Sequence, residues 1–141
     1  MKSVLTIMMF CSVWFANAQE TVIQKKDLPK AAQEFLTKEY AYNDWAIGKK
    51  DLGSRSLKYK VTLADGAEIE FDKDGQWKEI DGKGTQIGAH FIPNKISQYV
   101  KANYPGQSFT KIDKSDRKIE VKLTNKVELE FTKDGDFVKI D

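Results

Sequence analysis

The stretch that decides the fold is "EIEFDKDGQWKEID", Glu68–Asp81, because it recurs with small changes as "ELEFTKDGDFVKID", Glu128–Asp141. Extended backwards, Val61–Asp81 and Val121–Asp141 share ten identities over 21 positions. A repeat of this length, present only twice, does not fit a solenoid and indicates the duplication of one small unit. We therefore expect the two copies to fold alike.

Each copy begins with a predicted helix. "LPKAAQEFLTKEY" at Leu28–Tyr40 aligns with "IPNKISQYVKANY" at Ile92–Tyr104. Apolar residues recur in both segments with the period of a helix and line one side of it. They are Leu28, Ala32, Phe35 and Leu36 in the first copy and Ile92, Ile96, Tyr99 and Val100 in the second. We expect both stripes to pack against the core.

Alternating apolar and charged residues follow each helix. The alternation covers Leu57–Leu63 and Glu68–Phe71 in the first copy and Lys118–Leu123 and Glu128–Phe131 in the second, and first strands are expected near Trp45–Leu52 and Phe109–Lys114. Period two with one apolar side is typical of an antiparallel sheet covered on one face. The sequence thus predicts an α+β fold of two tandem α-β-β-β-β repeats, each a helix packed on a four-stranded antiparallel sheet.

The K-D-G sequence in each copy is interpreted as a hairpin turn. A three-residue loop over 73–75 places Phe71 opposite Trp77 and Glu70 opposite Lys78, which keeps one face apolar as strand pairing requires. Glycine in the last, left-handed position of such a loop is typical of a type I turn followed by a bulge. Two residues do not fit this register and would face outwards: Ile80 and Ile140. We expect a bulge before them or an apolar contact between the two copies.

The acidic residues around this turn do not predict a calcium site. An EF-hand loop needs oxygen ligands at alternate positions, glycine at the sixth position and a bidentate glutamate at the twelfth. Here Gly75 directly follows Asp74, predicted strands flank the loop, and Thr132 replaces Asp72 in the second copy. We expect no metal ion and no cofactor.

The N-terminal sequence "MKSVLTIMMFCSVWFANAQE" predicts export. One lysine, an apolar run from Val4 to Phe15 and the ending Ala16-Asn17-Ala18 are typical of a cleavable signal peptide, here cut after Ala18. The run is too short to anchor the chain in a bilayer, and it contains the single cysteine, Cys11. We expect a periplasmic or secreted protein without disulfides or membrane insertion after cleavage. Its predicted parts are a signal peptide at 1–18, a first repeat at 19–81, a linker at 82–86 and a second repeat at 87–141.

Catalysis and nucleic-acid binding find no support in the sequence. His90 is the only histidine, and no carboxylate lies at a spacing that suggests a triad. There is no G-x-S-x-G, H-E-x-x-H or phosphate-binding glycine loop. A net charge of +2 gives no electrostatic reason to expect nucleic acid as a partner. The sequence therefore predicts a protein that is not an enzyme.

The repeat resembles a known family. The pattern L-P…F-L…Y, then Y-x-V-x-L-x-D-G-x-E-I-E-F-D-x-x-G-x-W-x-x-I-D, is similar to that of secreted bacterial PepSY-like, β-lactamase-inhibitor-like proteins. In the first copy it is carried by Leu28, Pro29, Phe35, Leu36, Tyr40, Tyr59, Val61, Leu63, Asp65, Gly66, Glu68 to Asp72, Gly75, Trp77, Ile80 and Asp81. The second copy departs from it at Asn125-Lys126, where the first has Asp-Gly. The resemblance implies tandem α+β units with a shared polar sheet face, and an inhibitory or binding role toward a peptidase or another envelope protein.

Two functions from different classes remain open. The first is a non-catalytic module that binds an envelope protein through the polar sheet face. Its candidate residues are Lys58, Lys60, Glu68, Glu70, Lys118, Glu120, Lys122, Glu128 and Glu130. The second is a small-ligand carrier or envelope accessory protein with a pocket between sheet and helices. Its candidate lining residues are Tyr40, Tyr42, Trp45 and Tyr104.

Overall fold

A computed structural model describes residues 20–40, 44–51 and 57–141. The predicted signal peptide and Tyr42 lie outside these ranges. The elements are β1 (Glu20–Ile23), η1 (Lys25–Asp27), α1 (Lys30–Glu39), β2 (Trp45–Asp51), β3 (Lys58–Leu63), β4 (Glu68–Asp72), β5 (Trp77–Asp81), η2 (Ala89–Phe91), α2 (Asn94–Asn103), β6 (Phe109–Lys114), β7 (Lys118–Leu123), β8 (Glu128–Thr132) and β9 (Phe137–Ile140). Each predicted helix and each predicted strand is present.

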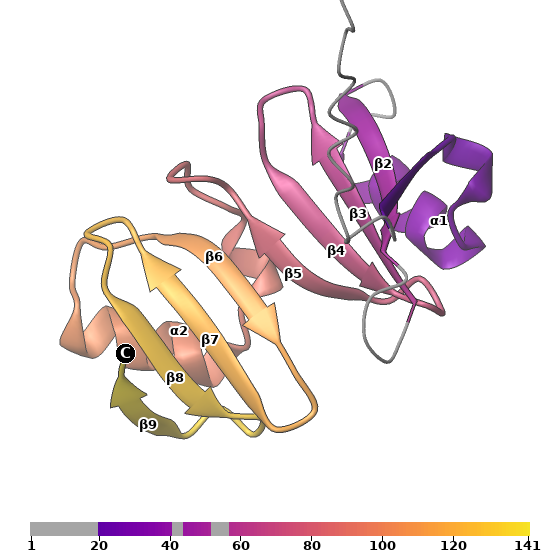
Figure 1. The fold of residues 1–141 in the computed structure, drawn as a ribbon. Coiled ribbons are helices and arrows are strands. Elements are labelled where there is room, and N and C mark those ends of the chain that lie inside the picture. The colour runs from indigo at the N-terminus through magenta and orange to yellow at the C-terminus, as the bar shows by residue number, and fades with distance from the viewer. Residues whose placement is uncertain (1–19, 41–43, 52–56) are drawn as a thin grey trace, which may run out of the picture.

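The strands form one antiparallel sheet of nine strands in chain order, from β1 to β9 (Figure 1). The α+β class and the antiparallel pairing are confirmed. The two predicted four-stranded sheets are not separate, because β5 pairs with β6 and joins them. The strand β1 was not expected, and it pairs with β2 at the outer edge of the first repeat.

One face of the sheet is apolar across all nine strands. A continuous row of paired residues runs along it: Ile23, Gly48, Val61, Ile69, Ile80, Ile112, Val121, Leu129 and Ile140. Both helices pack on this face, and their buried residues Leu36 and Val100 belong to the same core cluster as the strand residues. In Figure 1, α2 lies behind the strands of the second repeat. The helices therefore leave the opposite face of the sheet open.

The K-D-G turn has the predicted geometry. Gly75 has φ +85°, and Phe71 pairs with Trp77. The carboxylate of Asp72 accepts the backbone N–H groups of Asp74 and Gln76, each at 2.9 Å. In the second copy the hydroxyl of Thr132 accepts the N–H of Asp136 at 3.1 Å. The residue before each loop thus caps the turn, which explains why aspartate and threonine exchange there.

A bulge after the turn changes the register expected for the rest of β5. The pairing shifts between Glu70 and Phe71, so Glu70 lies opposite Glu79, and the expected pairing of Glu70 with Lys78 is wrong. The bulge reverses the facing of the residues that follow it. Ile80 consequently pairs with Ile69 on the apolar face and is fully buried. The expected bulge before Ile80 is confirmed.

Candidate functional site

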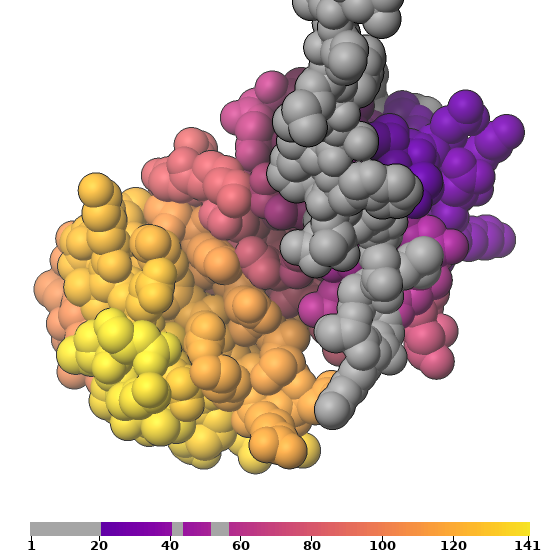
Figure 2. Space-filling view, in the orientation of Figure 1, coloured from indigo at the N-terminus to yellow at the C-terminus, as the bar shows by residue number. Residues whose placement is uncertain are grey.

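The open face of the sheet carries the charged residues of the alternating strands. We call it the outer face. The part of the chain that the structure describes places no helix on it, and Figure 2 shows it at the surface over the second repeat. Because neighbouring strands are paired in register, the charges form ordered rows rather than a scattered set.

All nine residues predicted for the interaction lie in strands of this face. Lys58 and Lys60 are in β3, Glu68 and Glu70 in β4, Lys118, Glu120 and Lys122 in β7, and Glu128 and Glu130 in β8. Several of them pair with each other. Lys60 lies 2.8 Å from Glu68, and Lys122 lies 3.1 Å from Glu128. Lys118 contacts Glu120 and lies 3.1 Å from Glu130.

The structure adds two acidic residues between the two predicted groups. In the register of neighbouring strands, Glu70 lies opposite Glu79, Glu79 opposite Asp113, Asp113 opposite Glu120, and Glu120 opposite Glu130. These five residues, which we call the carboxylate row, cross five neighbouring strands from β4 to β8. Lys60 lies opposite Glu70 at one end of the row, and Lys139 lies opposite Glu130 at the other. The carboxylate row crosses the junction between the two repeats.

The carboxylate row is incompletely neutralised over its part from Glu70 to Asp113. Lys111 lies 3.1 Å from Glu79, but the described residues provide no ion pair to Glu70 or Asp113. Burial, and then the neighbouring Glu79, raises the pKa of both Glu70 and Asp113. Since folding raises these pKa values, stability falls as the pH rises through them. Ionisation of Glu70 and Asp113 therefore lowers the stability of the fold.

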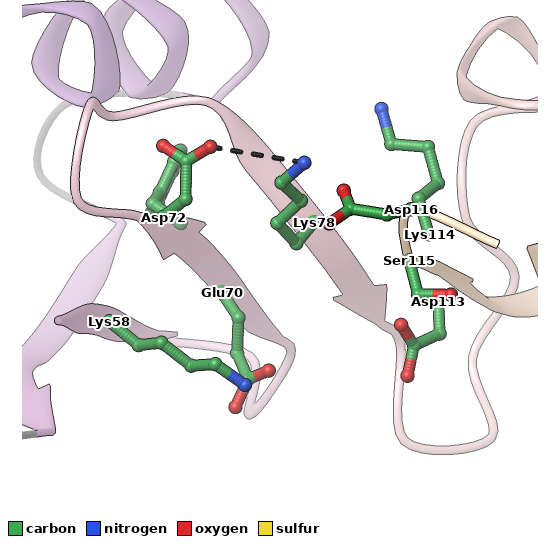
Figure 3. A pocket seen from close by; sticks show the side chains of 9 residues that line it. Lys58, Glu70, Asp72, Lys78, Asp113, Lys114, Ser115 and Asp116 are labelled. Carbon is green, nitrogen blue, oxygen red and sulfur yellow. Dashed lines mark ion pairs between the residues drawn. The ribbon is translucent and has the colours of Figure 1, made fainter. Parts of the chain in front are cut away.

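A hollow of about 290 Å³ lies beside the row at the repeat junction. Figure 3 shows its polar lining, which comes from β3, β4, β5, the end of β6 and the loop after it: Lys58, Glu70, Asp72, Lys78, Asp113, Lys114, Ser115 and Asp116. Asp72 and Lys78 lie 3.9 Å apart across β4 and β5. The ammonium group of Lys114 lies 3.2 Å from the centre of the Trp77 ring. Burial, and then Lys78, lowers the pKa of Lys114 to about 8.

The comparison with protein families agrees with this architecture. Residues 57–139 match the family described as "Putative beta-lactamase-inhibitor-like, PepSY-like". The chain belongs to the PepSY-like family. No curated protein matches the chain. The comparisons indicate no catalytic family for this PepSY-like protein.

Three solved Bacteroides structures are similar to it. A "putative periplasmic protein" of the DUF2874 family from Bacteroides vulgatus has 31% identity and a TM-score of 0.82, over 88% of this chain and 98% of that one. A "putative calcium-regulated periplasmic protein" from Bacteroides thetaiotaomicron has 34% identity and a TM-score of 0.81, over 86% and 96%. A second "putative periplasmic protein" from B. vulgatus has 38% identity and a TM-score of 0.80, over 86% and 98%. All three are described as periplasmic. In the described ranges of this PepSY-like protein, neither helix has the length and apolarity needed to cross a bilayer.

The aromatic residues proposed for a ligand pocket have separate neighbours. Tyr40 stacks on Phe91 with ring centres 6.3 Å apart, and burial raises its pKa to about 12. Trp45 lies under the ammonium group of Lys25, 5.0 Å from the ring centre. Tyr104 packs against the core at the end of α2. The contacts of these three residues thus do not define a common pocket.

The single histidine pairs with a carboxylate that sequence spacing did not reveal. His90 Nε2 lies 2.7 Å from Glu39 Oε2, so η2 is tied to the end of α1. Its ring also contacts Phe91, with centres 4.0 Å apart. No described serine or threonine is hydrogen-bonded to His90, and the pair is interpreted as a link between the repeats.

Proposed function

We propose that this PepSY-like protein is a periplasmic, non-catalytic module that binds a positively charged surface of another envelope protein through the outer face of its sheet. The observation that supports it is the carboxylate row, which crosses five strands on a face that the described helices leave open. The periplasmic location rests on the three similar structures and on the predicted signal peptide.

The electrostatics of the row favour a cationic partner. Burial, and then the neighbouring Glu79, raises the pKa of Glu70 and of Asp113, so ionising either carboxyl group costs folding free energy. Lysine or arginine side chains of a partner would supply the missing positive charge and remove that cost on binding. Lys60 and Lys139 at the two ends would repel a partner placed out of register.

The lysines first predicted for the interface are less suitable as probes of binding. Lys60 and Lys122 are held in ion pairs with Glu68 and Glu128, at 2.8 Å and 3.1 Å. Reversing them would remove one ammonium partner from each of these carboxylates, so the variant would change local ion pairs as well as the charge of the face. Asp113 and Glu120 are better probes. They lie next to each other in the row, Asp113 has no ion pair among the described residues, and Lys118, which contacts Glu120, keeps Glu130 as a partner.

We expect the double substitution Asp113→Asn with Glu120→Gln to slow association with the partner by about tenfold at low ionic strength. Loss of two negative charges weakens electrostatic steering, and the difference should shrink as salt is added. The partner would first be captured from an envelope fraction with the wild-type protein and identified by mass spectrometry. Association rates of the purified pair would then be measured across a salt series.

A matched control is Glu34→Gln with Asp134→Asn, which removes two exposed negative charges away from the row. We expect this control to change the association rate by less than about twofold. An equal effect of both variants would mean that only net charge matters. A row variant that associates like the wild type would place the binding surface elsewhere.

Calcium regulation is described for one similar structure, and this chain also has a group of three close carboxylates. Oxygen atoms of Glu120, Glu130 and Asp141 lie within 4.8 Å of one another. Two lysines already pair with them: Lys118 contacts Glu120 and Glu130, and Lys139 lies 2.8 Å from Asp141. A calcium ion would have to displace both ammonium groups.

We therefore expect isothermal titration to show no calcium binding tighter than about 1 mM, which is weaker than sensor sites. Glu130→Gln should leave the titration unchanged. A micromolar site in the wild type that Glu130→Gln removes would instead make calcium-dependent binding the leading function of the outer face.

A further inference from the structure

The last strand of each repeat has a different environment: β5 is covered by a neighbouring strand on its outer edge, and β9 is not. Strand β9 in the second repeat corresponds to β5 in the first, and Ile140 corresponds to Ile80 at the offset of 60 residues that aligns the copies. Ile80 has no exposed surface because β6 pairs with the outer edge of β5. Ile140 is 58% exposed, since β9 is the last strand of the sheet.

The edge of β2 shows the same kind of protection. There β1 pairs with β2, and Ile23 lies opposite Gly48. The same position of the second repeat is Ile112 in β6, which lies opposite Ile80 at the repeat junction. The strand β1 therefore covers the outer edge of β2 in the first repeat, as β5 covers the outer edge of β6 in the second. In the described parts of the sheet, β9 is the β5-type strand whose outer edge has no partner strand.

The junction between the repeats supplies a register for a strand on β9. It consists of three residue pairs, Glu79 with Asp113, Ile80 with Ile112 and Asp81 with Lys111. The strand that covers β5 thus presents the sequence Lys-Ile-Asp, and β9 itself carries Lys-Ile-Asp at 139–141. Paired with itself in this register, β9 would place Ile140 against its own copy and Lys139 against Asp141 of the second molecule. The like-charged pair of the internal junction would be replaced by opposite charges.

The backbone of β9 is oriented for this pairing. Asp141 donates its N–H to the carbonyl of Glu128 at 3.0 Å, so Asp141 faces β8. Antiparallel strands alternate, and the N–H and C=O groups of Ile140 consequently point away from β8. Two copies of Ile140 would exchange both hydrogen bonds, as a hydrogen-bonded pair does.

We propose that a second copy of this chain covers β9, forming a two-fold symmetric dimer in which the nine-stranded sheets join through β9 in the register of the β5–β6 junction. The contact is short, so the dimer is weaker than one with a standard interface of roughly 1,200–2,000 Å². Its surface is the edge of the sheet, and it adjoins the end of the carboxylate row through Lys139, which lies opposite Glu130.

Sedimentation equilibrium of the protein at up to about 1 mM tests the proposal, since this range detects dissociation constants near that value. We expect a monomer–dimer equilibrium, and Ile140→Lys should raise its dissociation constant by at least about tenfold. Val22→Lys is the matched control, because Val22 is 72% exposed in the opposite edge strand β1. It should leave the equilibrium unchanged. A monomer at every concentration, or a dimer that tolerates Ile140→Lys, would overturn the proposal.

Two further experiments test the register. Lys139→Asp and Asp141→Lys should each weaken the dimer, and the double variant should restore it, because residue 139 then meets residue 141 with opposite charge again. In a Cys11→Ser background, Ile140→Cys should form a disulfide-linked dimer, since paired Cα atoms lie about 5.5 Å apart. Lys139→Cys should not, because two copies of residue 139 are offset along the strands. Failure of the double variant to restore association would overturn this register.

Discussion

Replacing Phe71 with alanine is expected to lower the free energy of unfolding by about 3–5 kcal/mol, with a similar loss for Phe131→Ala. Both rings are buried on the apolar face. Phe71 packs edge-on against Phe35 with ring centres 5.6 Å apart, and Phe131 packs in the same way against Tyr99 at 5.4 Å. Removing either ring leaves a cavity between sheet and helix, and urea unfolding monitored by circular dichroism would measure the loss.

Phe137→Ala provides the control for this pair of substitutions. Phe137 stacks on Tyr99 with ring centres 4.7 Å apart, but it lies in the edge strand β9 and keeps 39% of its surface exposed. We expect a loss of about half that of Phe131→Ala or less, since less apolar surface is withdrawn from water. A loss below about 1 kcal/mol for Phe71→Ala would show that the apolar face does not form the core.

Ile80→Ala is expected to cost about 2–5 kcal/mol, whereas Ile140→Ala at the same repeat position should cost less than about 1 kcal/mol. The two residues share a sequence context and a bulge, and they differ in whether a strand covers their edge. Denaturation at micromolar concentration, where the protein is monomeric, would compare them. Equal losses would mean that the edge of β9 is covered within one molecule.

The duplication made most of the fold predictable. Period-two alternation defined the inward and outward sides of β3, β4, β7 and β8, and the helical stripes ending at Leu36 and Val100 defined the faces of α1 and α2. The strand β1 was missed because its four residues, Glu20–Ile23, are too few to show a period and lie next to the predicted cleavage site. The joining of the two sheets was also missed, since pairing across the linker leaves no local pattern.

The candidate site was predictable in part. Its face and nine of its residues followed from alternation, but Glu79 and Asp113 did not. The bulge at Lys78 moves Glu79 from the apolar side to the outer face. A bulge inserts a single residue into a strand and so leaves the alternation on either side of it unchanged. The sequence signal for this bulge was Ile80, because the register without a bulge places this isoleucine on the charged face. Asp113 entered the site only through the pairing of β5 with β6.

The order of the strands bears on how this chain reaches its folded state. Because the order of the strands in the sheet is their order in the sequence, each strand from β2 onwards pairs with the strand that precedes it in the chain. The longest separations are those from β1 to β2 and from β5 to β6, each spanning one short 3-10 helix and one α-helix. Closing such loops loses little entropy, and chains rich in near-neighbour contacts fold quickly. The sheet can therefore grow strand by strand as the chain emerges, and only its last edge is left to be covered by another molecule.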